Sequence, residues 1–119
     1  AFPIEELGGR TGWRWAAQDR LPVIGAVPDP QGAAMGRPLD QPRFVPRMAG
    51  LYVFTALGSR GITWSPLGAQ TLAALITGAP CPLEASLLDA VDPARFLSRA
   101  VRRQARPASR GSGHTPAGD

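Results

Sequence analysis

The sequence predicts an α/β fold, and three features in the middle of the chain carry that prediction. The run Leu51–Leu57 is apolar nearly throughout and rich in aromatic and β-branched residues, which is typical of a strand covered on both faces in a parallel sheet. Gly58 and Gly61 follow it and indicate a turn. The stretch after the turn has the pattern of a helix, so we expect a strand, a glycine-bearing turn and a helix in succession.

The helix after the turn has recognisable start and end signals. Ser65 is suited to the N-cap, Pro66 to the first helical position, and Gly78 to the residue that ends the helix. A start one turn earlier, near Gly61, also agrees with the pattern and places Pro66 inside the helix. The apolar face of this helix is expected to consist of Leu67, Thr71, Leu72, Leu75 and Ile76.

A second strand is expected before this unit, over Gly12–Ala17. Side chains alternate along a strand, so Trp13 and Trp15 would share a core face and Arg14 would project from the opposite face into solvent or a cleft. The next stretch, Asp19–Gly25, should be extended, because its proline disfavours helical geometry in the residue before it. We interpret Asp19 as a turn-former or local hydrogen-bond acceptor rather than a catalytic base.

The remaining segments are shorter or irregular. Residues 28–48 contain five prolines and no periodic apolar face, which indicates a long surface loop. A short helix is expected over Glu84–Ala90, and a last helix should begin after Asp92-Pro93. The apolar face of that last helix should contain Phe96, Leu97, Ala100 and Val101. We therefore divide the chain into a folded segment, residues 1–105, and a disordered tail, residues 106–119, whose composition is Arg, Ser, Gly and Pro.

Composition limits the function classes. The 119 residues have a formal net charge of +4, and all the basic residues are arginine. We ascribe the absence of lysine to a GC-rich coding sequence rather than to nucleic-acid binding. One cysteine, Cys81, excludes an internal disulfide, and the single His114 leaves a metal site almost without ligands. No signal peptide is visible and no apolar run reaches the ~18 residues of a membrane helix, so we expect a cytoplasmic protein with no membrane partner.

The chemistry is expected at the strand–turn–helix unit. Unpaired amides at a helix start carry partial positive charge and favour an anion or an electron-rich carbonyl. Gly58 and Gly61 would permit a ligand to approach the backbone closely, and Arg60 could add a formal charge or form a salt bridge. Taken alone, this is a weak signal, and the glycines are better explained by packing.

Two motifs strengthen the ligand interpretation. The first is Asp19-Arg20-Leu21-Pro22-Val23-Ile24-Gly25, and the second is Gly50-Leu51-Tyr52-Val53-Phe54 continued by Gly58-Ser59-Arg60-Gly61-Ile62-Thr63-Trp64-Ser65-Pro66-Leu67. Together they resemble the C-terminal part of the D-amino-acid-oxidase-like flavoproteins, which include glycine oxidase and sarcosine oxidase. Further matches are Gly9-Arg10-x-Gly12-x-Arg14, Ala56-Leu57-Gly58-Ser59-Arg60-Gly61 and Asp92-Pro93-x-Arg95-Phe96. With these, residues 9 to about 100 resemble the FAD-dependent half of the bifunctional bacterial proteins that make 5-methylaminomethyl-2-thiouridine in tRNA.

This resemblance implies a fold and a reaction. The chain would be the C-terminal segment of an FAD domain: the strand, glycine turn and helix, plus one strand of the substrate domain. In such enzymes FAD oxidises an N-substituted glycine, here the carboxymethylaminomethyl group of the tRNA wobble uridine, and hydrolysis of the imine leaves an aminomethyl group. The cofactor-binding residues carried over are Gly58, Ser59, Arg60, Gly61, Ile62 and Thr63, against the pyrimidine edge of the flavin. Arg14 corresponds to a position that holds a substrate carboxylate. No catalytic residue is assigned.

The chain also departs from that pattern. It lacks the G-x-G-x-x-G motif that holds the FAD pyrophosphate, and it lacks a methyltransferase half. We therefore expect FAD to be held only by the full-length parent protein, with the remainder of the FAD domain and tRNA as partners and a methyltransferase domain upstream. Three alternatives remain open: a cofactor-free basic RNA-binding module, a cofactor-free remnant, and a segment of a general glycine- or sarcosine-oxidase-like flavoenzyme. The arginines from Arg95 to Arg110 would contact tRNA phosphates or form a solvated helix face.

Overall fold

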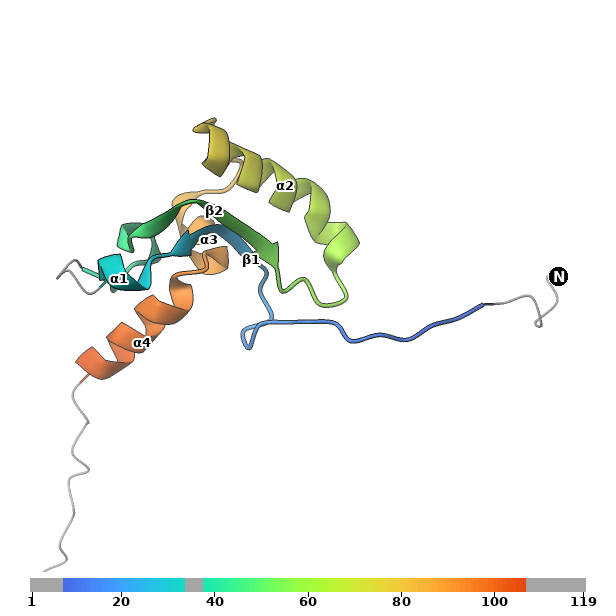
Figure 1. The fold of residues 1–119 in the computed structure, drawn as a ribbon, viewed down its shortest axis with the longest axis horizontal. Helices are drawn as coiled ribbons and strands as arrows, with labels where there is room; N and C mark the ends of the chain where they lie inside the picture. Colours follow the sequence, from blue (N-terminus) through green and yellow to red (C-terminus); the bar gives the residue numbers. More distant parts are fainter. Residues whose placement is uncertain (1–7, 34–37, 107–119) are drawn as a thin grey trace, which may run out of the picture.

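The computed structural model describes residues 8–33 and 38–106, which form a mixed α/β arrangement. Figure 1 shows helix α2 on one side of a small sheet and helix α4 extending from the opposite side. The tail expected to be disordered lies outside the described residues, apart from Arg106. No helix in the described ranges combines the length and the apolarity needed to span a membrane. The elements along the chain are β1 (Val23–Pro28), α1 (Pro30–Ala33), the 3-10 helix η2 (Pro42–Phe44), β2 (Arg47–Thr55), α2 (Gly61–Thr77), α3 (Ala85–Val91) and α4 (Arg95–Ala105).

The sheet consists of β1 and β2, paired antiparallel. Ile24 lies opposite Phe54, Ala26 lies opposite Tyr52, and the register shifts between Ala26 and Pro28. The strand predicted over 51–57 is confirmed, but β2 begins earlier, at Arg47, and ends at Thr55. The prediction that this strand lies in a parallel sheet and is covered on both faces is wrong for the described residues. No parallel neighbour flanks β2 there, and most of its residues are exposed or only partly covered.

Helix α2 begins at Gly61, so the earlier of the two predicted starts is the correct one. Arg60 occupies the N-cap position, and Pro66 lies inside the helix. Ser65 is not the cap: its hydroxyl donates to the Gly61 carbonyl at 2.6 Å within the helix. Gly78 ends the helix with a φ of 74°, a left-handed conformation that favours glycine, as the sequence predicts.

The face of α2 that packs on the sheet consists of small residues. Of the predicted apolar face, Thr71 is buried and Leu72 is half-buried, whereas Leu67, Leu75 and Ile76 are exposed. The other buried residues of the helix are Gly68 and Ala74. The reason is steric. A Cβ on Gly68 would lie 2.6 Å from Cε2 of the Phe54 ring, so a small residue is required where the helix crosses β2.

The segment before β1 is not a strand. Ala16 alone forms an isolated bridge, to Leu57, and residues 8–15 have no regular structure. Trp13 and Trp15 are exposed, so the core role predicted for them is wrong in the described structure. No described element covers the face on which they lie. The extended geometry expected around Pro22 is confirmed from Val23, where β1 begins.

The loop between the strands is less irregular than expected. Residues 28–48 contain α1, η2 and the start of β2, so the loop prediction holds for only part of this range. Helix α3, Ala85–Val91, confirms the short helix predicted over 84–90. Helix α4 is confirmed as well, but its buried face differs: Arg95 and Ser98 are buried, whereas Phe96 is exposed.

Gly25 shows how one motif residue shapes the fold. Its φ is +140°, a conformation that residues with side chains rarely adopt, and a Cβ there would lie 3.2 Å from Cδ of Pro93. The glycine of the first motif therefore lets the chain entering α4 approach β1 closely. The motif residues Gly25 and Pro93, far apart in sequence, meet at this contact.

Candidate cofactor and substrate site

The turn between β2 and α2 is built on left-handed backbone. Ala56 has a φ of 60° although it is not glycine, and it is buried; Gly58 follows with a φ of 57°. The Arg60 amide donates to the Leu57 carbonyl at 3.0 Å and closes the turn. An alanine in this conformation carries strain that the surrounding contacts must offset. The turn is therefore held in one specific shape directly before the start of α2.

The turn is joined to the segment that carries Arg14. The Gly58 amide donates to the Trp15 carbonyl at 3.0 Å, and Ala16 bridges Leu57. The Arg60 guanidinium donates to the carbonyl of Arg20, which itself has a φ of 58°. The predicted turn and the predicted substrate segment thus lie next to each other. They enclose an open pocket of about 370 Å³ lined by Ala16, Arg20, Ala56, Leu57, Gly58, Ser59 and Arg60.

The start of α2 faces open space. The Ile62 side chain is 93% exposed, and a Cβ on Gly61 would meet only Leu57, at ordinary contact distance. Among the described residues, the amides of Gly61, Ile62 and Thr63 have no acceptor; the first amide of the helix to find one is that of Trp64, which donates to Arg60 at 3.0 Å. Three amides free at a helix N-terminus are suited to an anion or a polarised carbonyl.

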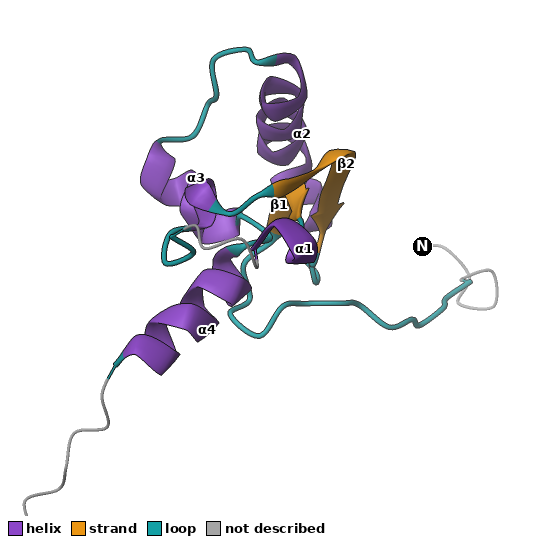
Figure 2. Ribbon diagram, turned by 60° about the vertical axis from the view of Figure 1, so that its left-hand side comes forward, coloured by secondary structure: helices purple, strands orange, loops and turns teal. Residues whose placement is uncertain are grey.

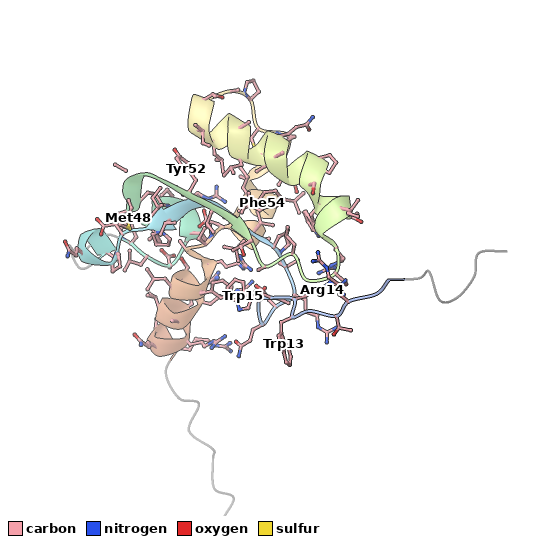
Figure 3. The ribbon with its side chains drawn as sticks, turned by 45° about the vertical axis from the view of Figure 1, so that its right-hand side comes forward. Trp13, Arg14, Trp15, Met48, Tyr52 and Phe54 are labelled. Atoms are coloured by element: carbon pink, nitrogen blue, oxygen red, sulfur yellow. The ribbon has the colours of Figure 1, made fainter. Side chains whose placement is uncertain are left out.

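Arg14 is exposed, and its side chain has no hydrogen bond or ion pair with any described residue. Figure 3 shows Arg14 beside the turn that leads into α2, while Trp13 points away. Its neighbour Trp15 accepts the hydrogen bond from Gly58, so the backbone holds Arg14 close to the turn. A free guanidinium at this point can bind a carboxylate through both of its oxygens.

Arg60 has a partner that the sequence did not reveal. The contact is with the backbone carbonyl of Arg20 rather than with a carboxylate, so the salt bridge considered for Arg60 is not formed among the described residues. The Arg60 guanidinium therefore links the turn after β2 to the segment before β1, and we interpret Arg60 as a residue that positions the two.

Asp19 anchors this whole segment to α4. Arg95 donates to both of its carboxylate oxygens, at 2.8 and 3.0 Å, and Arg99 donates to one of them at 2.5 Å. The Leu21 amide also donates to Asp19, at 3.2 Å, which confirms the predicted local acceptor role. The hydrogen bonds from Arg95 hold the pKa of the Asp19 carboxyl well below its usual range, partial burial opposes that shift, and Arg99 and the Leu21 amide add to it.

The Arg95 side chain is almost wholly buried and is fully hydrogen bonded. Besides Asp19, its guanidinium donates to the carbonyls of Leu21, Val91 and Asp92. This role was missed from sequence, where Arg95 was grouped with the solvent-facing arginines. The sequence did contain a signal for this ion pair. Asp19 and Arg95 both belong to motifs of the family resemblance, and a carboxylate and a guanidinium in such motifs are candidates for an ion pair.

A second ion pair joins the sheet to the start of α4. Arg47 donates to both oxygens of Asp92, at 2.8 and 2.7 Å, and also to the carbonyls of Ala26 and Pro42. Asp92 in turn accepts from the Ala94 amide at 2.6 Å, so it shapes the turn between α3 and α4. Within the described ranges, His, Cys, Asp and Glu side chains form no group of three that could hold a metal ion.

Sequence comparison relates the chain to bacterial bifunctional proteins named for the synthesis of a modified tRNA nucleoside. These relatives carry the name tRNA 5-methylaminomethyl-2-thiouridine biosynthesis bifunctional protein MnmC. The protein from Methylibium petroleiphilum is 63% identical over 92 residues, which are 74% of this chain and 14% of the relative. Those from Burkholderia ambifaria and Burkholderia vietnamiensis are 50% and 48% identical over 102 residues, 83% of this chain and 16% of each relative. No protein-family model matches the chain.

The resemblance found from the motifs is thereby confirmed. The chain is homologous to one segment of these bifunctional proteins and spans only 14–16% of their length.

Proposed function

We propose that the chain is part of an FAD-dependent amine oxidoreductase that modifies tRNA, acting on the carboxymethylaminomethyl group of the wobble uridine. The observation that carries the proposal is the junction of the glycine turn with the Arg14 segment through the Gly58–Trp15 hydrogen bond and the Ala16–Leu57 bridge. The turn that precedes the free amides of α2 is thus hydrogen bonded to the residue that follows Arg14, although Arg14 itself lines a neighbouring hollow with Arg10, Thr11, Gly12 and Trp13. The names of the relatives, which are tRNA-modifying proteins, support the substrate class.

The residues present fit a flavin edge. Gly58 and Gly61 leave the backbone accessible, since a Cβ on either would meet nothing closer than 3.7 Å. The free amides of Gly61, Ile62 and Thr63 would stabilise negative charge on an electron-rich ring. FAD, when bound, would supply the redox chemistry by accepting a hydride equivalent from the carbon next to the substrate nitrogen. The pyrophosphate of the cofactor would be held by a part of the parent protein outside this chain.

The residues of this chain would contribute by positioning the substrate relative to the flavin. Arg14 would bind the carboxylate of the N-carboxymethyl group through two parallel hydrogen bonds and so fix the direction of the amine. Arg60 would keep the Arg14 segment against the turn through the Arg20 carbonyl. The distance between the substrate carboxylate and the ring would then be set by the backbone contacts between Trp15 and Gly58.

The first test is Arg14→Lys in the full-length parent protein. Lysine keeps the charge but loses the two-pronged geometry, so we expect substrate binding to weaken by ~1–3 kcal/mol, roughly one to two decades in affinity. The flavin spectrum should be unchanged. The measurement is a flavin absorbance titration beside single-turnover reduction by carboxymethylaminomethyl-modified tRNA. Loss of flavin from this variant, or reduction at the wild-type rate at all substrate concentrations, would remove Arg14 from the site.

The second test is Gly61→Val in the same protein. A branched side chain here would occupy the open space in front of the α2 amides, so flavin occupancy should fall severalfold while the protein stays folded. The matched control is Gly12→Val, an exposed glycine of the N-terminal segment around which a Cβ meets nothing within 4 Å. Equal flavin content in the two variants would contradict a flavin site at the turn.

A further inference from the structure

The arginines at the end of the chain fall into two groups. Arg95 and Arg99 both donate to Asp19, and Arg95 is buried. Arg102 and Arg103 in the last turn of α4, and Arg106 as its C-cap, are exposed. None of these three forms an ion pair or a side-chain hydrogen bond with a residue in 8–33 or 38–106. We call them the outer arginines.

Three of the described carboxylates near this end of the chain are paired: Asp19 with Arg95 and Arg99, Asp92 with Arg47, and Asp89 with Arg43. Asp40, which lines the same hollow as Arg102, forms no ion pair with a described residue and offsets one of the three outer charges. The outer arginines therefore still leave an excess of positive charge at one end of a chain whose net charge is +4. Arg102 and Arg106 lie about one helical turn apart, a rise of roughly 6 Å, with Arg103 beside them. This is an unbalanced cationic surface, complementary to a row of regularly spaced anions.

We propose that the outer arginines of α4 bind the phosphate backbone of RNA. The proposal rests on the function proposed above, in which the substrate is a tRNA, and it assigns the surface on which that tRNA lies. Guanidinium groups bind phosphate oxygens with paired hydrogen bonds, and neutralising several phosphates supplies most of the sequence-independent affinity of such complexes.

The position of α4 relative to Arg14 supports this assignment. Asp19 follows Arg14 by five residues and is held by the first two arginines of α4, so the helix is fastened to the substrate segment. The Arg95 guanidinium also lies 4.2 Å from the centre of the Phe96 ring, which helps to hold the first turn of the helix. Beyond that anchor α4 extends away from the sheet, and its last turn is open to solvent (Figure 2). RNA on the outer arginines would thus be held at a definite place relative to Arg14.

The experiment measures binding of the 119-residue chain to a fluorescein-labelled anticodon stem–loop RNA without modified bases, by fluorescence anisotropy between 50 and 200 mM salt. In R102Q/R103Q we expect the dissociation constant to rise about tenfold or more at low salt. The slope of log affinity against log salt should fall by about 2, one for each phosphate that an arginine no longer neutralises. R102K/R103K should bind within about threefold of wild type, because lysine also binds phosphate as a point charge.

A charge-matched control separates location from net charge. R10Q is compared with the single variants R102Q and R103Q: it removes the same one positive charge from an exposed described residue outside α4 and should retain most of the affinity and the salt slope. Far-ultraviolet circular dichroism establishes that the variants share the wild-type fold. Equal reductions of affinity in R10Q, R102Q and R103Q would overturn the proposal, as would binding of polyglutamate or anionic vesicles with the same affinity as RNA. Because this assay needs no flavin, wild-type binding through α4 alongside a failed flavin reduction would reject the proposed function and leave this inference standing.

Discussion

Asp19→Ala is expected to destabilise the folded chain by about 3–5 kcal/mol, the cost of breaking a buried ion pair by removing one partner. Arg95 is only 1% exposed, and its charge would be left with carbonyl oxygens alone. The same change would free α4 from the segment that carries Arg14. Small domains are stable by only ~5–15 kcal/mol, so this loss is a large share of the total.

Urea denaturation at neutral pH measures the effect, with Arg99→Gln as the control. Arg99 contacts the same carboxylate but is partly exposed, so its removal should cost about 1 kcal/mol or less. The pH dependence provides a second measurement. Because the folded-state pKa of Asp19 lies below its unfolded value of ~3.9, its contribution is complete at neutral pH and declines as the pH falls below about 4. The gap between wild type and Asp19→Ala should narrow on acidification; a gap that is constant from pH 7 to pH 3, or under 1 kcal/mol throughout, would contradict the assignment.

Gly68→Leu is expected to cost about 1–2 kcal/mol net, or to dislodge α2 from the sheet. Even a Cβ at this position would lie 2.6 and 3.1 Å from Cε2 and Cε1 of the Phe54 ring, so a larger side chain must push the helix outward. Overpacking of this kind typically costs about 1–3 kcal/mol, occasionally more, and here it exceeds the ~1 kcal/mol that leaving glycine gains in helix propensity.

Ala69→Leu is the matched control, because it places the same side chain on the same helix at an exposed position. Its stability should stay within about 0.5 kcal/mol of wild type in thermal and urea denaturation. The double variant Gly68→Leu with Phe54→Ala should regain part of the stability that Gly68→Leu removes, since deleting the ring opens room for the leucine. Unchanged stability of Gly68→Leu would show that α2 does not pack on Phe54.

Local signals in the sequence were enough to predict the main elements. The apolar run Leu51–Leu57, the glycines of the turn and Gly78 defined β2, the turn and the end of α2, because each depends on neighbours a few residues away. The motif residues also predicted the homology to the bifunctional tRNA-modifying proteins. The sequence predicted two alternative starts for α2, because both Gly61 and Ser65-Pro66 are compatible with a helix N-terminus.

Only the tertiary structure decided which residues meet. Alternation along a strand predicted a core face for Trp13 and Trp15, yet their segment forms no strand and both lie in solvent, since burial depends on what packs opposite. The helical periodicity of α2 could not reveal that the small face at Gly68 and Ala74 turns inward, because the Phe54 ring sets that orientation. Likewise the ion pair of Asp19 with Arg95 joins residues 76 positions apart. A contact between residues so far apart in sequence forms only when the whole chain folds, so no local sequence pattern predicts it.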